Sequence, residues 1–105
     1  MQEYLTPDAA KRALAYDQAR LAQIEADEPA GGLDRWGWLC VRRNLVGDLT
    51  DRAGALIEAW DSVGDEAAAT AVEELGEHYA HLYKQADDTL EAARRELATD
   101  AEIDL

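Results

Sequence analysis

The chain has 105 residues, of which 23 are acidic and 10 are lysine or arginine, so its formal net charge is -13 at pH 7. A surface with this charge repels nucleic acids and anionic membranes, and it attracts basic molecules over a range set by the ionic strength. The composition therefore argues against direct binding to DNA, RNA or a membrane surface.

Length and composition favour a small folded protein over a disordered tail. Apolar residues make up 48% of the chain, whereas disordered acidic segments are poor in them. We expect residues 1–105 to form a single helical domain, because domains commonly have this length. The chain contains no apolar run of about 18 residues, and its start lacks the pattern of a signal peptide. We therefore expect a soluble, cytoplasmic protein.

The first predicted helix covers residues 7–26. Thr6 suits the N-cap position, Pro7 the first helical position and Asp8 the acidic first turn, which together mark a helix start. The segment Glu-Pro-Ala-Gly-Gly at 28–32 predicts its end, because proline cannot continue a helix and paired glycines allow a chain reversal.

The second predicted helix covers residues 34–62. Its later half carries apolar residues at spacings of four and three, the pattern of a helix packed against another helix. These residues are Leu49, Ala53, Leu56, Trp60 and Val63. Glycine inside a helix costs about 0.5–1 kcal/mol relative to alanine, so Gly47 and Gly54 are weak points. We expect an unbroken helix; the alternative is a kink near Gly47, unless a neighbour packs closely against it.

The third predicted helix covers residues 66–99 and is the longest. Gly64 and Asp65 supply a C-terminal stop for the preceding helix and an N-cap for this one. Its apolar residues alternate at spacings of three and four, as in coiled coils and antiparallel bundles. They form a seam of Val72, Leu75, Tyr79, Leu82, Ala86, Leu90, Ala93 and Leu97. Residues 100–105 are expected to form a frayed acidic tail.

Together these elements predict an all-α protein with three main helices, arranged as an antiparallel bundle or an open helical array. At 1.5 Å per residue, the third helix is about 50 Å long and the first about 30 Å. Part of the seam therefore outreaches the first helix, and pairing of two copies would bury it. On this ground we expect a homodimer or a higher oligomer.

Acidic residues of the third predicted helix recur on the side opposite its apolar seam. They are Glu66, Glu73, Glu77, Asp88 and Glu91, with Glu74 close by. One interpretation is an ordinary solvated face, supported by the possible i,i+4 pairs of Lys84 with Asp88 and of Glu91 with Arg95. The other is a binding surface, because carboxylates repeated at every helical turn of about 5.4 Å imitate the charge rows of a nucleic-acid backbone.

Adaptation to salt is a third interpretation of the charge. An acidic surface with only two lysines, Lys11 and Lys84, is also typical of proteins that work in concentrated salt, where self-repulsion is screened. On this interpretation the charge carries no information about partners.

An aromatic pair, Trp36 and Trp38, lies near the start of the second predicted helix. Side chains two residues apart point about 200° apart on a helix, so both can be buried only where the segment is irregular or lies between two surfaces. One interpretation is core packing. The other is a partner-binding site, because Arg35, Arg42 and Arg43 are adjacent and Trp and Arg are enriched at such sites.

Catalytic and metal-binding patterns are weak in this sequence. Glu74, His78 and His81 share one flank of the third predicted helix, but they match neither a di-iron nor a zinc-peptidase motif. Ser62 and Cys40 lie in no known nucleophile motif, and we interpret Cys40 as a small buried apolar residue. We therefore expect no enzyme activity, no cofactor and no metal.

The functional hypothesis is a small non-catalytic binding protein that occludes a basic, nucleic-acid-binding surface of another protein. In size and composition the chain resembles phage-encoded or mobile-element inhibitors of host defence that act as DNA mimics. Its candidate contact residues are Glu66, Glu73, Glu74, Glu77, Asp88 and Glu91, together with Trp36 and Trp38. The alternative is an accessory or structural subunit that docks on a larger complex through its apolar seam and the two tryptophans.

Overall fold

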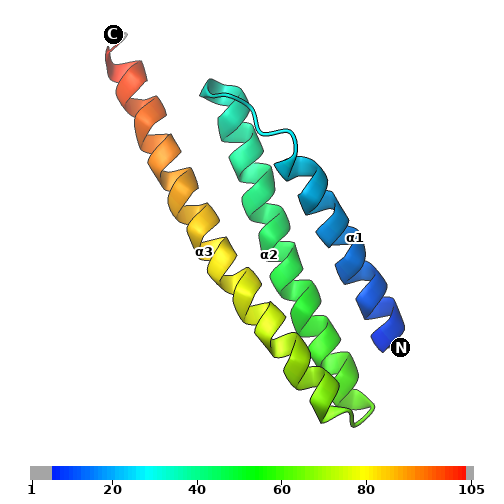
Figure 1. The fold of residues 1–105 in the computed structure, drawn as a ribbon. Coiled ribbons are helices and arrows are strands. Elements are labelled where there is room, and N and C mark those ends of the chain that lie inside the picture. Colours follow the sequence, from blue (N-terminus) through cyan, green and yellow to red (C-terminus); the bar gives the residue numbers. More distant parts are fainter. Residues whose placement is uncertain (1–5, 104–105) are drawn as a thin grey trace, which may run out of the picture.

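The computed structural model describes residues 6–103, which form three α-helices. They are α1 (Pro7–Glu25), α2 (Gly32–Ser62) and α3 (Glu66–Ile103), as Figure 1 shows. No strand occurs in this part of the chain. The predicted all-α class with a long C-terminal helix is therefore confirmed.

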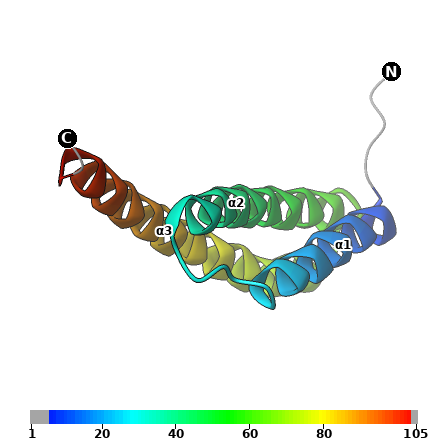
Figure 2. The same ribbon diagram turned by 90° about the horizontal axis from the view of Figure 1, so that it is seen from above.

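The middle helix, α2, lies between the other two and runs antiparallel to both (Figures 1 and 2). α1 and α3 each pack against α2, whereas no Cα atom of α1 comes within 8 Å of one in α3 over the described residues. The molecule is an elongated antiparallel bundle of 61 × 28 × 20 Å. α1 is the shortest helix and covers only the central part of α2 (Figure 1).

The main core lies where side chains of all three helices meet. Leu14 and Leu21 of α1, Leu49 of α2 and Tyr79 of α3 are each buried in it. Gln18 of α1 also donates a hydrogen bond from Nε2 to the Tyr79 hydroxyl, at 2.8 Å. Long side chains thus join α1 to α3, although the two backbones stay apart.

A second, smaller core lies between α2 and α3. It consists of Leu39, Leu90 and Ala93, and Trp36 and Cys40 pack against it as half-buried residues. The pattern of the third predicted helix therefore identified core positions over its whole length.

Two helix starts have the predicted caps. Thr6 Oγ1 accepts a hydrogen bond from the backbone N–H of Ala9 at 3.2 Å, and Asp65 Oδ1 accepts one from Ala68 at 3.0 Å. Gly64 has a φ of 79°, a left-handed conformation that glycine adopts without steric cost, and it ends α2 as predicted.

The start of α2 differs from the prediction. The helix begins at Gly32, two residues before the predicted start at residue 34. The first helical residue has a φ of 68°, and Gly31, the N-cap, provides no side-chain hydrogen bond. The prediction relied on side-chain caps, whereas here the helix starts at a glycine in the left-handed conformation, Gly32.

α2 is unbroken across Gly47, as expected. A Cβ atom at Gly47 would lie 3.2 Å from Cε2 of Tyr83, so the aromatic ring of α3 packs closely against the glycine. This contact meets the condition under which the sequence predicted a continuous helix. Gly54 has no such neighbour within 4 Å.

Toward its C-terminus, α3 is longer than predicted and continues to Ile103, four residues past residue 99. Asp104 and Leu105 of the predicted acidic tail lie outside the described residues. Every member of the α3 seam is buried or half-buried within the single chain, because α2, at 31 residues, accompanies most of α3. The seam therefore leaves no exposed member that a second copy would have to bury, and self-association stays a prediction.

One prediction about the packing of the second helix is wrong. Val63 is 60% exposed, because it is the C-cap of α2 and the chain leaves the helix there. Trp60 is half-buried, and the other three residues of that pattern are buried.

Candidate binding surface

The hairpin formed by α2 and α3 has two faces, and α1 covers one of them (Figure 2). We call these the covered face and the open face. At the contact between the two helices, Ala53 and Ile57 of α2 lie 3.7 and 4.0 Å from the position of a Cβ at Gly76 of α3. The preceding residues, Leu56 and Leu75, pack in the main core with α1, on the covered face.

Acidic side chains of both helices point to the open face. Glu58 and Glu77 follow the contact residues Ile57 and Gly76, and each step turns a helix by about 100°. Because α2 and α3 are antiparallel, both rotations lead to the same side of the hairpin, away from Leu56 and α1. Glu58 and Glu77 are both exposed there.

Around the α2–α3 turn, the acidic residues have no lysine or arginine among them. Residues 53–83 contain seven acidic residues and no lysine or arginine. All seven are exposed, and none forms an ion pair within the described residues. We call this set the acidic end: Glu58, Asp61, Asp65, Glu66, Glu73, Glu74 and Glu77.

The later part of the predicted acidic stripe has a different character. Asp88 and Glu91 are exposed, as predicted, but Lys84, Arg94 and Arg95 lie among them. Glu91 forms its ion pair with Arg94 at 3.7 Å, and not with Arg95 as the sequence suggested. Nor does Lys84 pair with Asp88 within 4.0 Å in the described structure. The C-terminal half of the stripe therefore carries mixed charge.

Sequence reasoning confined to the third helix missed three members of the acidic end: Glu58, Asp61 and Asp65. They belong to α2 and to the turn, and only the hairpin brings them beside Glu66 and Glu73. A signal was present in the sequence, because the stretch without lysine or arginine already begins before Glu58.

Next to the acidic end, an open groove of about 500 Å³ lies between α2 and α3. Asp48 and Asp51 form part of its α2 side, and Ala80 and Tyr83 form its α3 side. Tyr83 is 40% exposed although its ring packs on Gly47. No residue of α1 lines this groove, in agreement with its position on the open face.

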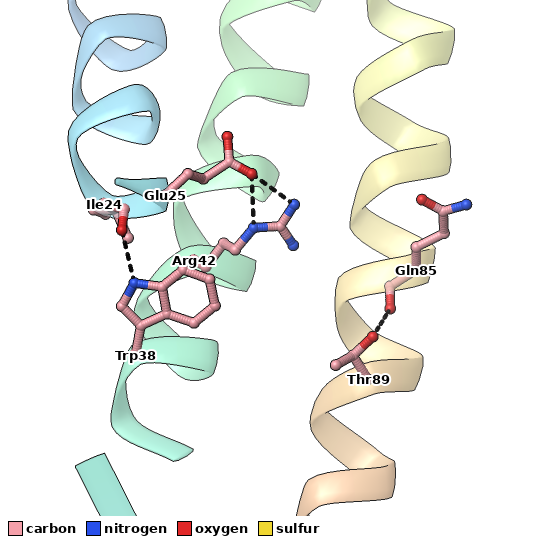
Figure 3. Close-up of polar contacts among 6 residues, drawn as sticks. All are labelled: Ile24, Glu25, Trp38, Arg42, Gln85 and Thr89. Atoms are coloured by element: carbon pink, nitrogen blue, oxygen red, sulfur yellow. Dashed lines mark hydrogen bonds and ion pairs between the residues drawn. The ribbon is translucent and has the colours of Figure 1, made fainter. Parts of the chain in front are cut away.

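The two tryptophans have partners inside the chain. Trp38 donates a hydrogen bond from Nε1 to the carbonyl oxygen of Ile24 at 2.9 Å, which Figure 3 shows at the end of α1. Trp36 packs against the core between α2 and α3. Trp38 also packs against that core, and both tryptophans are half-buried.

The arginines near the tryptophans are also engaged. Arg42 contacts Glu25 Oε2 through Nη2 at 3.1 Å and through Nε at 3.2 Å (Figure 3). Arg43 Nη1 lies 3.2 Å from Asp87 Oδ1. These pairs tie α2 to α1 and α3, so the aromatic segment serves the fold.

The histidines do not converge on a common point. His81 Nε2 lies 3.2 Å from Gln85 Nε2, whereas the His78 ring lies beside the Tyr79 ring with centroids 5.5 Å apart. In the described part of the chain, no three His, Cys, Asp or Glu side chains form a group able to hold a metal ion.

Neither the apolar character of the described helices nor the comparisons with known proteins assign a function. None of the helices, as far as they are described, is long and apolar enough to cross a membrane. No protein-family model, no curated protein and no solved structure matches this chain. The surface itself therefore carries the information on function.

Proposed function

We propose that this protein is a non-catalytic binding protein that covers a basic, nucleic-acid-binding surface on another protein. The observation that carries the proposal is the acidic end, with seven exposed carboxylates and no cation between residues 53 and 83. The proposed contact set is centred there, on Glu66, Glu73, Glu74 and Glu77. It involves no cofactor and no reaction.

The charge density of the acidic end supports mimicry of a nucleic acid. Its seven carboxylates share an axial length of about 16.5 Å, the rise of α3 from residue 66 to 77, or about one charge per 2.4 Å. A DNA strand carries one charge per about 3.4 Å, and the duplex one per about 1.7 Å. A partner with a channel shaped for a nucleic-acid backbone would therefore meet a comparable field.

The uneven distribution of charge favours function over adaptation to salt. Carboxylates are spread evenly, with 7 in the 31 residues 53–83 and 16 in the other 74, as a salt-adapted surface would also have them. The cations are not: all ten lysines and arginines lie outside residues 53–83. The cations of the other segments are paired with carboxylates at four places. Self-repulsion within the acidic end is left uncompensated, which a binding role explains.

A docking subunit is the second candidate, and one observation favours it. Leu33 and Val41 of α2 are 76% and 50% exposed, and Val41 lines a shallow hollow with Trp38 and Ile24. Exposed apolar side chains beside a tryptophan are typical of contact sites. This role would use that hollow and leave the acidic end in solvent.

Capture and displacement distinguish the two candidates. The wild-type protein is immobilised and incubated with a cell lysate at low salt. Each captured protein is then purified and bound to a fluorescent DNA duplex. Occlusion predicts that the wild-type protein displaces the duplex and that Glu73→Lys/Glu77→Lys does not. Capture that survives this variant but is lost in Val41→Asp would support the docking subunit instead.

A further inference from the structure

The groove on the open face differs from the rest of the acidic surface because it combines charge with shape. Asp48 and Asp51 lie one turn apart on α2. The side chain of Ala80 is small, and the ring of Tyr83 stands beside it, 40% exposed. A volume of about 500 Å³ lies within the range of about 300–1,000 Å³ that is usual for ligand sites.

The carboxylates of this groove are available to a ligand. Neither Asp48 nor Asp51 has an ion-pair partner within the described residues. Arg52 lies close to both in an adjoining hollow, but its Nε contacts Asp17 Oδ2 of α1 at 3.1 Å. A second cation, Arg43, is held by Asp87, and Lys84, which follows Tyr83, forms no ion pair with a carboxylate of the described residues. The carboxylates of Asp48 and Asp51 are therefore left to bind a cation of a partner.

We propose that this groove binds an arginine side chain of the basic partner, as the anchor of the interface. The guanidinium group contacts the Asp48 and Asp51 carboxylates, and its flat face or its aliphatic stem lies on the Tyr83 ring. This inference depends on the proposed function, because the same partner covers the acidic end while its arginine enters the groove.

Arginine suits this lining better than lysine for two reasons. Its planar guanidinium presents several donors that match carboxylates, whereas an ammonium group acts as a point charge. It also stacks on aromatic rings, a contact worth about 0.5–1 kcal/mol at an exposed site, or roughly two- to fivefold in affinity. Hence the groove should bind arginine more tightly than lysine, a preference that the acidic end alone does not predict.

The test compares two peptides of equal length, oligoarginine and oligolysine, by isothermal titration calorimetry on the full chain. We expect oligoarginine to bind roughly two- to fivefold more tightly than oligolysine. The preference should disappear in Asp48→Asn/Asp51→Asn and in Tyr83→Leu, which keeps an apolar contact with Gly47. The control Asp27→Asn/Glu28→Gln makes the same charge change at two exposed sites and should keep the preference.

The outcomes separate this inference from the proposed function. Equal affinities for the two peptides, both weakened by Glu73→Lys/Glu77→Lys, would overturn the arginine site and leave the acidic surface intact. A preference that persists in both groove variants would also overturn it. If neither peptide binds, both proposals fail. Melting curves show whether a variant that loses the arginine preference is still folded. If a groove variant is unfolded, the test is made on the wild-type protein: its backbone amide chemical shifts should change mainly around the groove when oligoarginine is added, and changes located elsewhere would overturn the arginine site.

Discussion

The two faces of the α2–α3 hairpin differ in what they contribute. The covered face holds the main core, the bond between Gln18 and Tyr79 and the ion pair between Asp17 and Arg52. The open face holds exposed carboxylates and a groove, at which Tyr83 packs on Gly47. One side of the same pair of helices therefore carries the main core, and the other carries exposed carboxylates that form no ion pair.

This separation has a functional consequence. Substitutions on the open face can change binding without disturbing the fold, because the side chains there are exposed and mostly without partners. Substitutions on the covered face should change stability and should affect binding only through unfolding.

The first prediction concerns the centre of the covered face. Leu49 is fully buried, so Leu49→Ala should lower the free energy of unfolding by about 2–5 kcal/mol, through lost burial and a residual cavity. Urea denaturation followed by circular dichroism measures the change. Val63→Ala, at a 60% exposed position, is the control and should change stability by about 0.5 kcal/mol or less. Equal effects at the two positions would contradict the assigned core.

The second prediction concerns the ion pair that attaches α1. Asp17 is 4% exposed, and Arg52→Leu would leave its carboxylate buried without a partner. We expect a loss of about 1–3 kcal/mol in the free energy of unfolding. The double variant Asp17→Leu/Arg52→Leu should recover most of it, since an apolar pair can replace a buried ion pair. A double variant less stable than Arg52→Leu would show that the pair is not the source.

The third prediction concerns the end of α1. Trp38→Phe keeps an aromatic ring but removes the hydrogen bond to the Ile24 carbonyl, and it should cost about 0.5–1.5 kcal/mol. Trp36→Phe is the matched change, because the described structure shows no hydrogen bond for its indole. Thermal melts of the two variants should differ by that amount, and identical melts would argue against the Trp38 bond.

The fourth prediction uses two glycines of α2. Gly54 has open space around it, so Gly54→Ala should raise stability by about 0.5–1 kcal/mol through helix propensity. Gly47→Ala should gain less, because its Cβ would lie 3.2 Å from the Tyr83 ring and the ring must move. Chemical denaturation of both variants checks the order. A larger gain at Gly47 would mean that Tyr83 does not pack there.

Much of this fold could be predicted from the sequence, because its signals are local. The caps at Thr6 and Asp65 and the break at Gly64 depend on neighbouring residues alone, and the three–four pattern identified the buried side of α3. The start of α2 at Gly32 could not be predicted in this way, since it depends on backbone freedom and on no side-chain cap.

The candidate surface was predicted only in part, for a different reason. Exposure of Glu73 and Glu77 follows from the period of one helix, but their proximity to Glu58 depends on how α2 and α3 pack. The groove beside Tyr83 likewise exists only between two helices. A surface shared by two helices can be predicted only when their relative position is known, and the periodic pattern of one helix does not contain that information.

The most direct test of the central claim compares two double charge reversals with the same change in net charge. Glu73→Lys/Glu77→Lys alters the acidic end, and Asp88→Lys/Glu91→Lys alters the mixed part of α3. Both should change the free energy of unfolding by about 0.5 kcal/mol or less, because all four side chains are exposed.

The measurement is the affinity of each variant for an oligolysine peptide at low salt, by calorimetry. We predict that Glu73→Lys/Glu77→Lys weakens binding by about tenfold, equivalent to about 1.4 kcal/mol, and that the other reversal has a clearly smaller effect. Equal losses in the two variants would mean that only net charge matters, and would contradict a binding surface located at the acidic end.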